Sequence, residues 1–167
     1  RDDNHIFSPI PLEAYDEIES DDTAFLILGG SANHRKQARD LRLNNVQFLD
    51  TASDIGLIHK FLNTLDVYAH GRSDGEQCSS SIIEGLSHGL PMISHSAASM
   101  GQVEQIGDAG EVVDSYEEYA DVMRRMIDDS EYYNQCVSNS SLRYNKVYNI
   151  KSIIDRFVQI YMDIVND

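Results

Sequence analysis

Residues Asp74 to Pro91 read D-G-E-Q-C-S-S-S-I-I-E-G-L-S-H-G-L-P, and they join a polar loop to a helical pattern. Ser79 to His88 carries its apolar residues at helical spacing, and Gly89 suits the C-terminal cap of such a helix. Two acids stand in this stretch, Glu76 in the loop and Glu84 in the helix. A carboxylate beside a buried face is costly unless a partner stabilises it, so both acids require an explanation.

Strands alternate with helices on both sides of this stretch. Short apolar runs predict strands at 24–28, 45–49, 66–69, 91–94 and 111–113. Helical patterns between the strands occupy 9–19, 31–43, 54–65 and 79–88. The end of the chain is wholly helical, with one helix that begins at 115 and two more over 131–144 and 150–164. The alternation predicts an α/β fold, a Rossmann-like doubly wound parallel sheet with helices on both faces.

The length of 167 residues fits one domain. Because the pattern begins with a helix, the first strand of the doubly wound unit is expected before Arg1. We therefore expect residues 1–167 to form a single domain taken from a longer two-domain chain, with C-terminal helices over 115–167.

The charge and the cysteines limit the partners of the chain. The net charge of -15 argues against nucleic acid or an anionic membrane as the main partner, since either needs a basic face. Cys78 and Cys136 have no metal-ligand spacing, so no metal site is expected. Two free thiols in a reducing, cytoplasmic compartment are the simpler interpretation, and a disulfide stays open as the alternative. The sequence shows no transmembrane segment and no signal peptide.

The loop over 70–77 follows a predicted strand, and ligands of doubly wound folds bind at this edge of the sheet. The loop leads into a helix near Ser79, where unpaired N–H groups and the helix dipole attract an anion such as phosphate. Glu76 and Glu84 then suit hydroxyl groups on either side of the phosphate. A nucleotide-sugar has this layout, with ribose, diphosphate and sugar in order.

Each of these residues also has an ordinary structural interpretation. Glu76 can be a solvated loop acid, Glu84 can pair with an arginine, and serines before a helix are common N-caps. Taken singly, each structural interpretation is the better one. Taken together in a strand–loop–helix context, the residues favour a ligand site.

Several segments between Ala24 and Val113 also resemble the motifs of one family, in the same order. Glu76 and Glu84 match its E-x7-E signature. The other matches are to its aDvyv, EAmaxGxPV, gGxxE and GdaG elements, at Leu65–Tyr68, Glu84–Pro91, Gly101–Glu104 and Gly107–Gly110. The chain thus resembles the C-terminal, donor-binding domain of retaining GT-B glycosyltransferases, in particular their group 4 family.

The resemblance implies roles for individual residues. Glu76 would contact hydroxyls of the transferred sugar and help to place its anomeric carbon, so it is the candidate catalytic residue. Glu84 would hold the ribose hydroxyls. Asp50 and Thr51, in the loop after a predicted strand, would lie beside the base.

The resemblance also implies a diphosphate site, and here the chain departs from the family. The amides of Cys78, Ser79 and Ser80 would hold the diphosphate, but both glycines of the family's E-G-F-G loop are replaced in this chain. Relatives carry an arginine and a lysine after the first strand. Arg1 belongs to the matching region, whereas the lysine position holds His5 or Ile6. Arg72 either compensates for the lost lysine or is an ordinary surface residue.

The implied activity is a retaining transfer of a hexosyl group from a UDP-, GDP- or ADP-sugar to a glycan or other hydroxyl acceptor. It requires no cofactor or metal, because protein positive charge stabilises the departing diphosphate. The acceptor would bind to an N-terminal domain outside residues 1–167, so this chain alone is expected to be inactive. Peripheral membrane association of the full-length protein stays open.

Two alternatives remain at this stage. One is a non-catalytic nucleotide-binding or protein-interaction module on the same fold, which the lost lysine and glycines would fit. The other is a GT-B enzyme that epimerises or phosphorolyses sugars. Loss of Glu76 should abolish turnover in a transferase and should matter little in a binding module.

Overall fold

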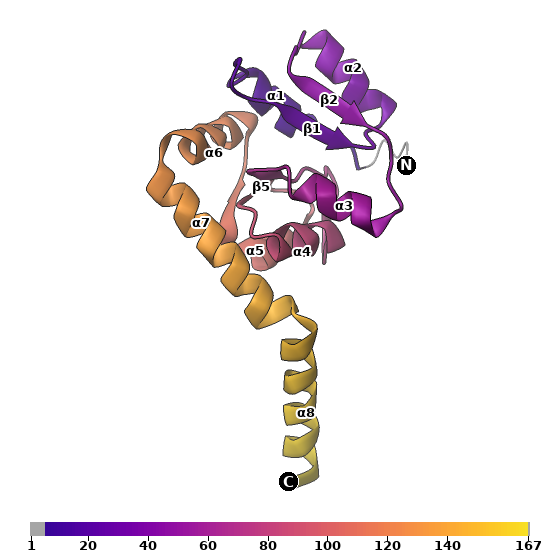
Figure 1. Ribbon diagram of the computed structural model, residues 1–167, viewed down its shortest axis with the longest axis vertical. Helices are drawn as coiled ribbons and strands as arrows, with labels where there is room; N and C mark the ends of the chain where they lie inside the picture. Colours follow the sequence, from indigo (N-terminus) through magenta and orange to yellow (C-terminus); the bar gives the residue numbers. More distant parts are fainter. Residues whose placement is uncertain (1–5, 167) are drawn as a thin grey trace.

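Parallel strands form the centre of the computed structural model, which describes residues 6–166 (Figure 1). They are β1 (Phe25–Leu28), β2 (Val46–Leu49), β3 (Tyr68–Ala69), β4 (Gly75–Glu76), β5 (Met92–His95), β6 (Ser99–Met100) and β7 (Gly110–Val113). Hydrogen bonds connect them as β1–β2, β3–β5–β7 and β4–β6, and every pair is parallel. The predicted α/β class with parallel strands is therefore confirmed.

The five predicted strands correspond to β1, β2, β3, β5 and β7. The short strands β4 and β6 were not predicted, and β4 lies inside the segment 70–77 that was expected to be a loop. Each has two residues, which is too short for the alternation that marks a strand in a sequence.

The helices follow the predicted order, with one addition. They are α1 (Ile10–Asp16), α2 (Ala32–Asp40), α3 (Ile55–Leu62), α4 (Ser80–Ser87), α5 (Gly101–Ile106), α6 (Tyr116–Asp128), α7 (Ser130–Arg143) and α8 (Ile150–Asn166). A 3-10 turn, η1 (Gly107–Ala109), follows α5, and a π-helical turn, η2 (Tyr144–Tyr148), joins α7 to α8. The additional helix, α5, supplies the crossover that the parallel strands β5 and β7 need, and its six residues are too few to show a period.

The start of α6 shows how the local sequence sets a helix boundary. Ser115 Oγ accepts a hydrogen bond from the N–H of Glu118, at 3.2 Å, as its capping-box pattern predicts. Glu118 Oε2 accepts from the N–H of Asp114, at 2.8 Å. The cap therefore satisfies one of the first N–H donors of α6, and the Glu118 side chain satisfies the N–H of Asp114.

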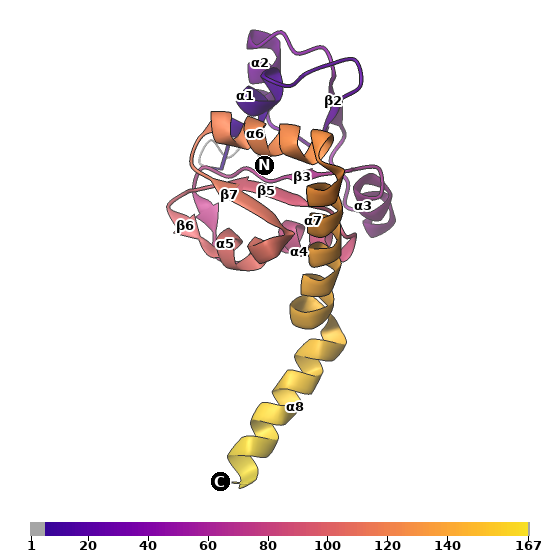
Figure 2. The ribbon, with the colours of Figure 1, turned by 90° about the vertical axis from the view of Figure 1, so that its left-hand side faces the viewer.

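Strand β5 is buried along its whole length and separates two apolar clusters. Met92 belongs to the cluster with α4 and α5, and Ile93 belongs to the cluster with α6. Successive residues of a strand point to opposite faces, so these neighbours anchor opposite layers. Figure 2 shows α6 on one side of the sheet and α4 and α5 on the other.

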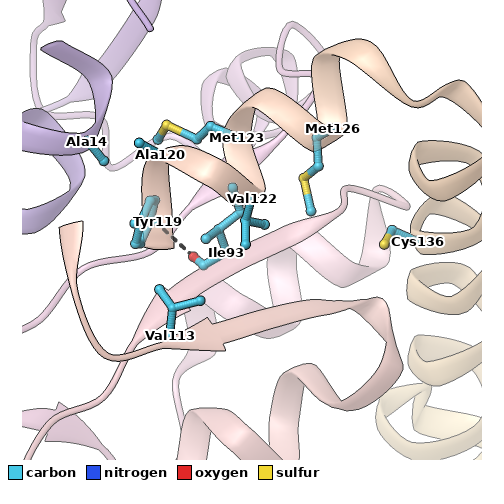
Figure 3. Close-up of a cluster of buried hydrophobic side chains, with 9 residues drawn as sticks. All are labelled: Ala14, Ile93, Val113, Tyr119, Ala120, Val122, Met123, Met126 and Cys136. Atoms are coloured by element: carbon cyan, nitrogen blue, oxygen red, sulfur yellow. Dashed lines mark hydrogen bonds between the residues drawn. The ribbon is translucent and has the colours of Figure 1, made fainter. Parts of the chain in front are cut away.

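The cluster under α6 joins five elements across the chain, including β7 through Val113 (Figure 3). Ala14 comes from α1, Ile93 from β5, and Cys136 from α7, and the helix α6 contributes the largest share. Tyr119 of α6 is completely buried, and its hydroxyl donates to the carbonyl oxygens of Ile93 and His70, at 3.0 Å each. The helix is thus attached to the sheet by packing and by a buried hydroxyl.

The last helix, α8, extends away from the rest of the molecule in Figures 1 and 2. Its predicted amphipathic helix is confirmed, but none of its residues is buried. Ile154, Phe157 and Tyr161 are 53%, 59% and 67% exposed. Among the described residues, no helix is long and apolar enough to cross a membrane.

Candidate functional site

Glu76 lies in β4, in register with Met100 of β6, at the carboxyl-terminal side of the central strands. The preceding residue, Gly75, has a φ of +68°, and a Cβ there would collide with the backbone of Ser99. A side chain at this position is therefore excluded by conformation and by space. The glycine lets the loop approach β6 and holds Glu76 in a partly buried position, with a side chain that is 15% exposed.

Arg72 binds Glu76 directly. Its Nη1 donates to Glu76 Oε1 at 2.6 Å, while Nε and Nη2 donate to the two carboxylate oxygens of Asp74 at 3.0 and 2.9 Å. The guanidinium therefore neutralises the acid that it orients. The expected contact of Arg72 with a diphosphate competes with these two ion pairs and stays a prediction.

Glu84 projects from α4 and is exposed, so it needs no cation to offset burial. No ion pair involves its carboxylate within residues 6–166, which leaves the arginine pairing considered from the sequence without support. Tyr68 of β3 lies close enough to both acids for their charges to act on its hydroxyl. Burial raises the pKa of the Tyr68 hydroxyl, a hydrogen bond with Ser81 lowers it, and the charges of Glu84 and Glu76 raise it further.

A groove of about 1260 Å³ brings these residues together. Its polar end is lined by Arg72, Glu76, Ser81 and Glu84, and the remainder is mainly apolar. Ser81 lies one turn before Glu84 on the same face of α4.

The N-terminus of α4 lies next to the polar end of the groove. Ser79 is buried, and its N–H donates to Gln105 Oε1 at 2.6 Å, while its carbonyl oxygen accepts from Gln105 Nε2 at 3.0 Å. Ser80 and Cys78 are both exposed. Of the three amides expected to hold a diphosphate, that of Ser79 is thus already bonded within the protein.

The remaining predicted residues lie apart from this group. Asp50 and Thr51 follow β2 and are exposed, but they are not among the residues that line the groove. Arg1 lies outside the described residues. The structure therefore unites Glu76, Glu84 and Arg72, places Cys78, Ser79 and Ser80 beside them, and leaves Asp50 and Thr51 at another strand end.

Two residues of α5, Gly101 and Gln105, support the loop that precedes α4, and the sequence indicated only Gly101. A Cβ at Gly101 would collide with the carbonyl oxygens of Gln77 and Glu76, so only glycine lets α5 start this close to the loop. The sequence indicated Gly101 through the gGxxE resemblance. Gln105 carried no such signal, because its role depends on a contact with Ser79 across 26 positions of the chain.

Buried polar atoms also gather at the ends of β3 and β5. His70 Nδ1 bonds to Ser94 Oγ at 2.9 Å, and His70 Nε2, Glu76 Oε2 and His95 Nε2 have no hydrogen-bond partner within residues 6–166. Burial lowers the pKa of His70 to about 4, against the opposing charge of Glu76, so the imidazole is neutral at pH 7. The described residues contain no group of three or more side chains suited to a metal ion.

Comparisons with solved structures place this arrangement in a known fold. The UDP-glucose complex of Alr3699/HepE from Anabaena superposes with a TM-score of 0.75 at 18% identity, over 95% of this chain and 47% of the other. Sucrose-phosphate synthase from Thermosynechococcus elongatus gives 0.78 at 18% identity, over 99% and 44%. The C-terminal domain of LpcC from Francisella tularensis, a glycosyl transferase group 1 family protein, gives 0.72 at 17% identity, over 85% and 79%.

The chain thus spans less than half the length of the first two proteins, and at these identities the likeness shows a shared Rossmann-like fold. No curated protein sequence matches the chain. The model of one family, described as glycosyl transferases group 1, matches residues 11–143, which include both acids, the loop between them and the groove-lining strands. The chain belongs to the glycosyl transferases group 1 family.

Proposed function

We propose that this chain is the donor-binding domain of a retaining glycosyltransferase that takes a nucleotide-diphospho-sugar. One observation carries the proposal: Glu76 and Glu84 line the same groove, beside the N-terminus of α4. The groove ends in carboxylates that accept hydrogen bonds from hydroxyls, and the helix terminus next to it suits a diphosphate. A ligand with hydroxyls on both sides of a diphosphate matches these groups in order.

In this proposal Glu84 accepts hydrogen bonds from the ribose, and Glu76 accepts them from the transferred sugar. The amides of Cys78 and Ser80 bind the diphosphate, and that of Ser79 joins them only by leaving Gln105. Glu76 is oriented by Arg72, so the direction of its second carboxylate oxygen is set by an ion pair within the protein. Preorganisation of this kind lowers the free energy needed to position the sugar.

The reaction breaks the bond between the anomeric carbon and the diphosphate oxygen, and the electron pair leaves with the nucleoside diphosphate. The acceptor oxygen forms a new bond on the same face of the sugar, and its proton passes to the departing phosphate oxygen. Backbone donors at the start of α4 stabilise the negative charge that develops on the leaving group. The acceptor binds to polypeptide beyond these residues, so the isolated chain is expected to bind donors without transferring sugar.

The test is ligand-detected NMR of this chain with UDP, GDP and ADP and with their glucose conjugates. A UDP-sugar is the first probe, since a similar fold from Anabaena was solved with UDP-glucose. We expect saturation transfer to one nucleotide and its loss in Glu84→Ala. Glu131→Ala is the matched control, because Glu131 is also exposed on a helix but lies outside the groove.

Retained binding in Glu84→Ala, or equal loss in both variants, contradicts the assignment of the ribose site. Binding of the sugar conjugate that is stronger than binding of the bare nucleotide, and is reduced to the nucleotide level by Glu76→Gln, supports the role of Glu76. Measurable transfer by the isolated chain to any hydroxyl acceptor contradicts the requirement for further polypeptide.

A non-catalytic nucleotide-binding module is the second candidate, and the contacts of Ser79 and Arg72 favour it. The Ser79 amide bonds to Gln105, and the Arg72 guanidinium bonds to Asp74 and Glu76, so both groups are engaged by other side chains of the protein. The two candidates differ in the sugar. A binding module is expected to bind nucleotide and nucleotide-sugar equally and to be insensitive to Glu76→Gln.

A further inference from the structure

A pair of histidines connects the ends of two helices at the surface of the domain. His59 lies in the last turn of α3, and His88 is the C-terminal cap of α4. The two imidazoles meet with His59 Nδ1 2.8 Å from His88 Nε2, and their ring centroids are 5.0 Å apart. Because the two residues are 29 positions apart in the chain, no motif spacing in the sequence marks them as a pair.

Asn63, the C-terminal cap of α3, holds His88 in one orientation and one tautomer. Its Oδ1 lies 2.9 Å from His88 Nδ1. An amide oxygen only accepts hydrogen bonds, so Nδ1 carries the proton and the neutral His88 ring keeps a lone pair on Nε2, the nitrogen that faces His59. Histidines that bind metal ions are held in this way, with the second ring N–H donated to an oxygen of the protein.

The distance between the two facing nitrogens is close to that required by one metal ion. Zinc is mostly tetrahedral with Zn–N distances of about 2.0–2.1 Å, so two imidazole nitrogens on one zinc ion lie about 3.3 Å apart. His59 Nδ1 and His88 Nε2 therefore have to separate by only about 0.5 Å. His59 also changes tautomer, with its proton moved to Nε2, so that both facing nitrogens carry lone pairs. His59 is exposed, so its ring is free to tilt and an ion can enter from solvent.

The charges around the pair favour a cation. The C-terminal end of a helix carries a partial negative charge, and both histidines lie at such an end. Glu84 lies one turn before His88 on α4, and its charge acts on the His88 imidazole. Lys60 is next to His59 in α3, but successive residues of a helix do not face each other. Two helix ends and one carboxylate thus attract a cation to the pair.

Packing beneath the pair fixes the two helices relative to each other. Leu62 of α3 and Leu86 of α4 are both buried in one apolar cluster, and each lies close in the chain to one of the histidines. Side chains on packed helices keep their geometry better than side chains on loops. The two imidazoles are therefore brought together by the fold, and an ion can bind without a movement of either helix.

We propose that His59 and His88 form a binding site for one divalent transition-metal ion of the class that prefers imidazole nitrogen, with zinc as its representative. His59 Nδ1 and His88 Nε2 bind the ion, which links α3 to α4, and Asn63 is a positioning residue that acts through His88. Because residues 6–166 contain no group of three metal-binding side chains, water completes the coordination. This inference stands independently of the proposed nucleotide-sugar.

The experiment is isothermal titration calorimetry of the chain, free of any affinity tag, with zinc chloride at neutral pH. We expect one ion per chain, and binding at least ~10-fold weaker in His59→Ala, in His88→Ala and in Asn63→Ala. His34→Ala is the matched control, because the His34 imidazole is bonded to Ser31 on another helix, α2. Calcium, which prefers oxygen ligands, should not bind at this site.

NMR of the imidazole nitrogens identifies the ligands directly, in a readout that a purely structural role of the histidines would not change. Zinc should shift the signals of His59 Nδ1 and His88 Nε2 and leave those of His34 unchanged. Asn63→Asp keeps an oxygen acceptor for His88 Nδ1, so this variant should recover the zinc binding that Asn63→Ala loses.

Several results would overturn the proposal. The absence of saturable zinc binding would show that the histidines only bond to each other. Unchanged binding in both histidine variants, or an equal loss in His34→Ala, would place the ion elsewhere, as would calcium binding that shifts the same imidazole signals. A zinc-dependent dimer in sedimentation, with one ion for two chains, would show that the ion is shared between copies instead of linking α3 to α4.

Discussion

Tyr119 is a single side chain that connects a helix to two strand ends. Its hydroxyl is buried and donates to the carbonyl oxygens of His70 and Ile93. Burial raises the pKa of this hydroxyl well above its usual value, so it stays a donor over the whole accessible pH range.

Replacing Tyr119 by phenylalanine keeps the packing and removes the donor. We expect Tyr119→Phe to lower the free energy of unfolding by about 1 kcal/mol, measured by urea denaturation, because buried carbonyls lose a partner. Tyr161→Phe is the control, since Tyr161 is 67% exposed on α8. Equal stability of both variants and the parent chain would contradict this role of the hydroxyl.

His70 makes the stability of the chain depend on pH. The pKa of the folded imidazole is about 4, mainly through burial, whereas the unfolded value is near 6.5. Between these values the unfolded chain binds more protons than the folded chain, so the free energy of unfolding falls as pH is lowered through this window. Above pH 6.5 both states are neutral at this residue, and it has no such effect.

The measurement is urea unfolding of the parent chain and of His70→Gln at pH 7.5, 6.5, 5.5 and 4.5. Across this pH window, we expect the free energy of unfolding of the parent to fall by about 3 kcal/mol more than that of the variant. The reason is that each pKa unit corresponds to about 1.4 kcal/mol. The comparison cancels the titration of the carboxylates that both proteins share. Parallel stability curves would show that His70 is protonated without cost in the folded state.

At the scale of elements, α8 contrasts with the other helices. None of its residues is buried, and apolar side chains such as Phe157, 59% exposed, point to solvent. A helix contributes to domain stability chiefly by burying its apolar face, and α8 buries little of its apolar face here. A contiguous exposed apolar surface also favours self-association.

Removal of residues 150–167 is therefore expected to change the thermal midpoint by no more than a few degrees and to raise solubility. Calorimetry and light scattering of the parent and truncated chains measure the two effects. Truncation inside α7, before Ser140, is the contrasting case, because Ser140 is buried and its hydroxyl donates to the carbonyl oxygen of Leu90. A large loss of stability on removing α8 alone would show that it packs on the domain in solution.

At the scale of the whole molecule, the central strands of residues 6–166 form two separately paired groups, one with β1 and β2 and one with β3, β5 and β7. The β1–β2 pair is attached through α1, which packs on α6, and through the connections to β3, without ladder hydrogen bonds to β3. The β3–β5–β7 sheet has apolar clusters on both faces. We expect the two parts to open independently, with the β1–β2 part the less stable.

Native-state hydrogen exchange tests this division. The amides of Phe25 and Gly29, which bond to β2, are expected to exchange through an opening of lower free energy than those of Tyr68 and His70, which bond to β5. Exchange of all four amides through one opening of equal free energy would mean that the domain unfolds as a unit.

Much of the fold could be predicted because its elements are marked by near neighbours in the chain. The strands over 25–28 and 92–95 appear as short apolar runs, and the helix over 116–128 has a serine cap and a regular apolar face. The elements that were missed, β4, β6 and α5, are too short to contain a period. Of the site, the sequence indicated Glu76, Glu84 and the helix N-terminus, but not the bond between Ser79 and Gln105.

By itself, the sequence determined that strands and helices alternate, that parallel strands form the sheet and that two acids stand eight positions apart across a loop and a helix. These properties depend on local conformation and on the burial of nearby residues. Only the tertiary structure decided that Arg72 binds Glu76, that His70 is buried neutral and that β1 and β3 line one groove. Such contacts depend on how distant segments pack, and no periodicity along the chain records which backbone or side-chain group lies opposite another.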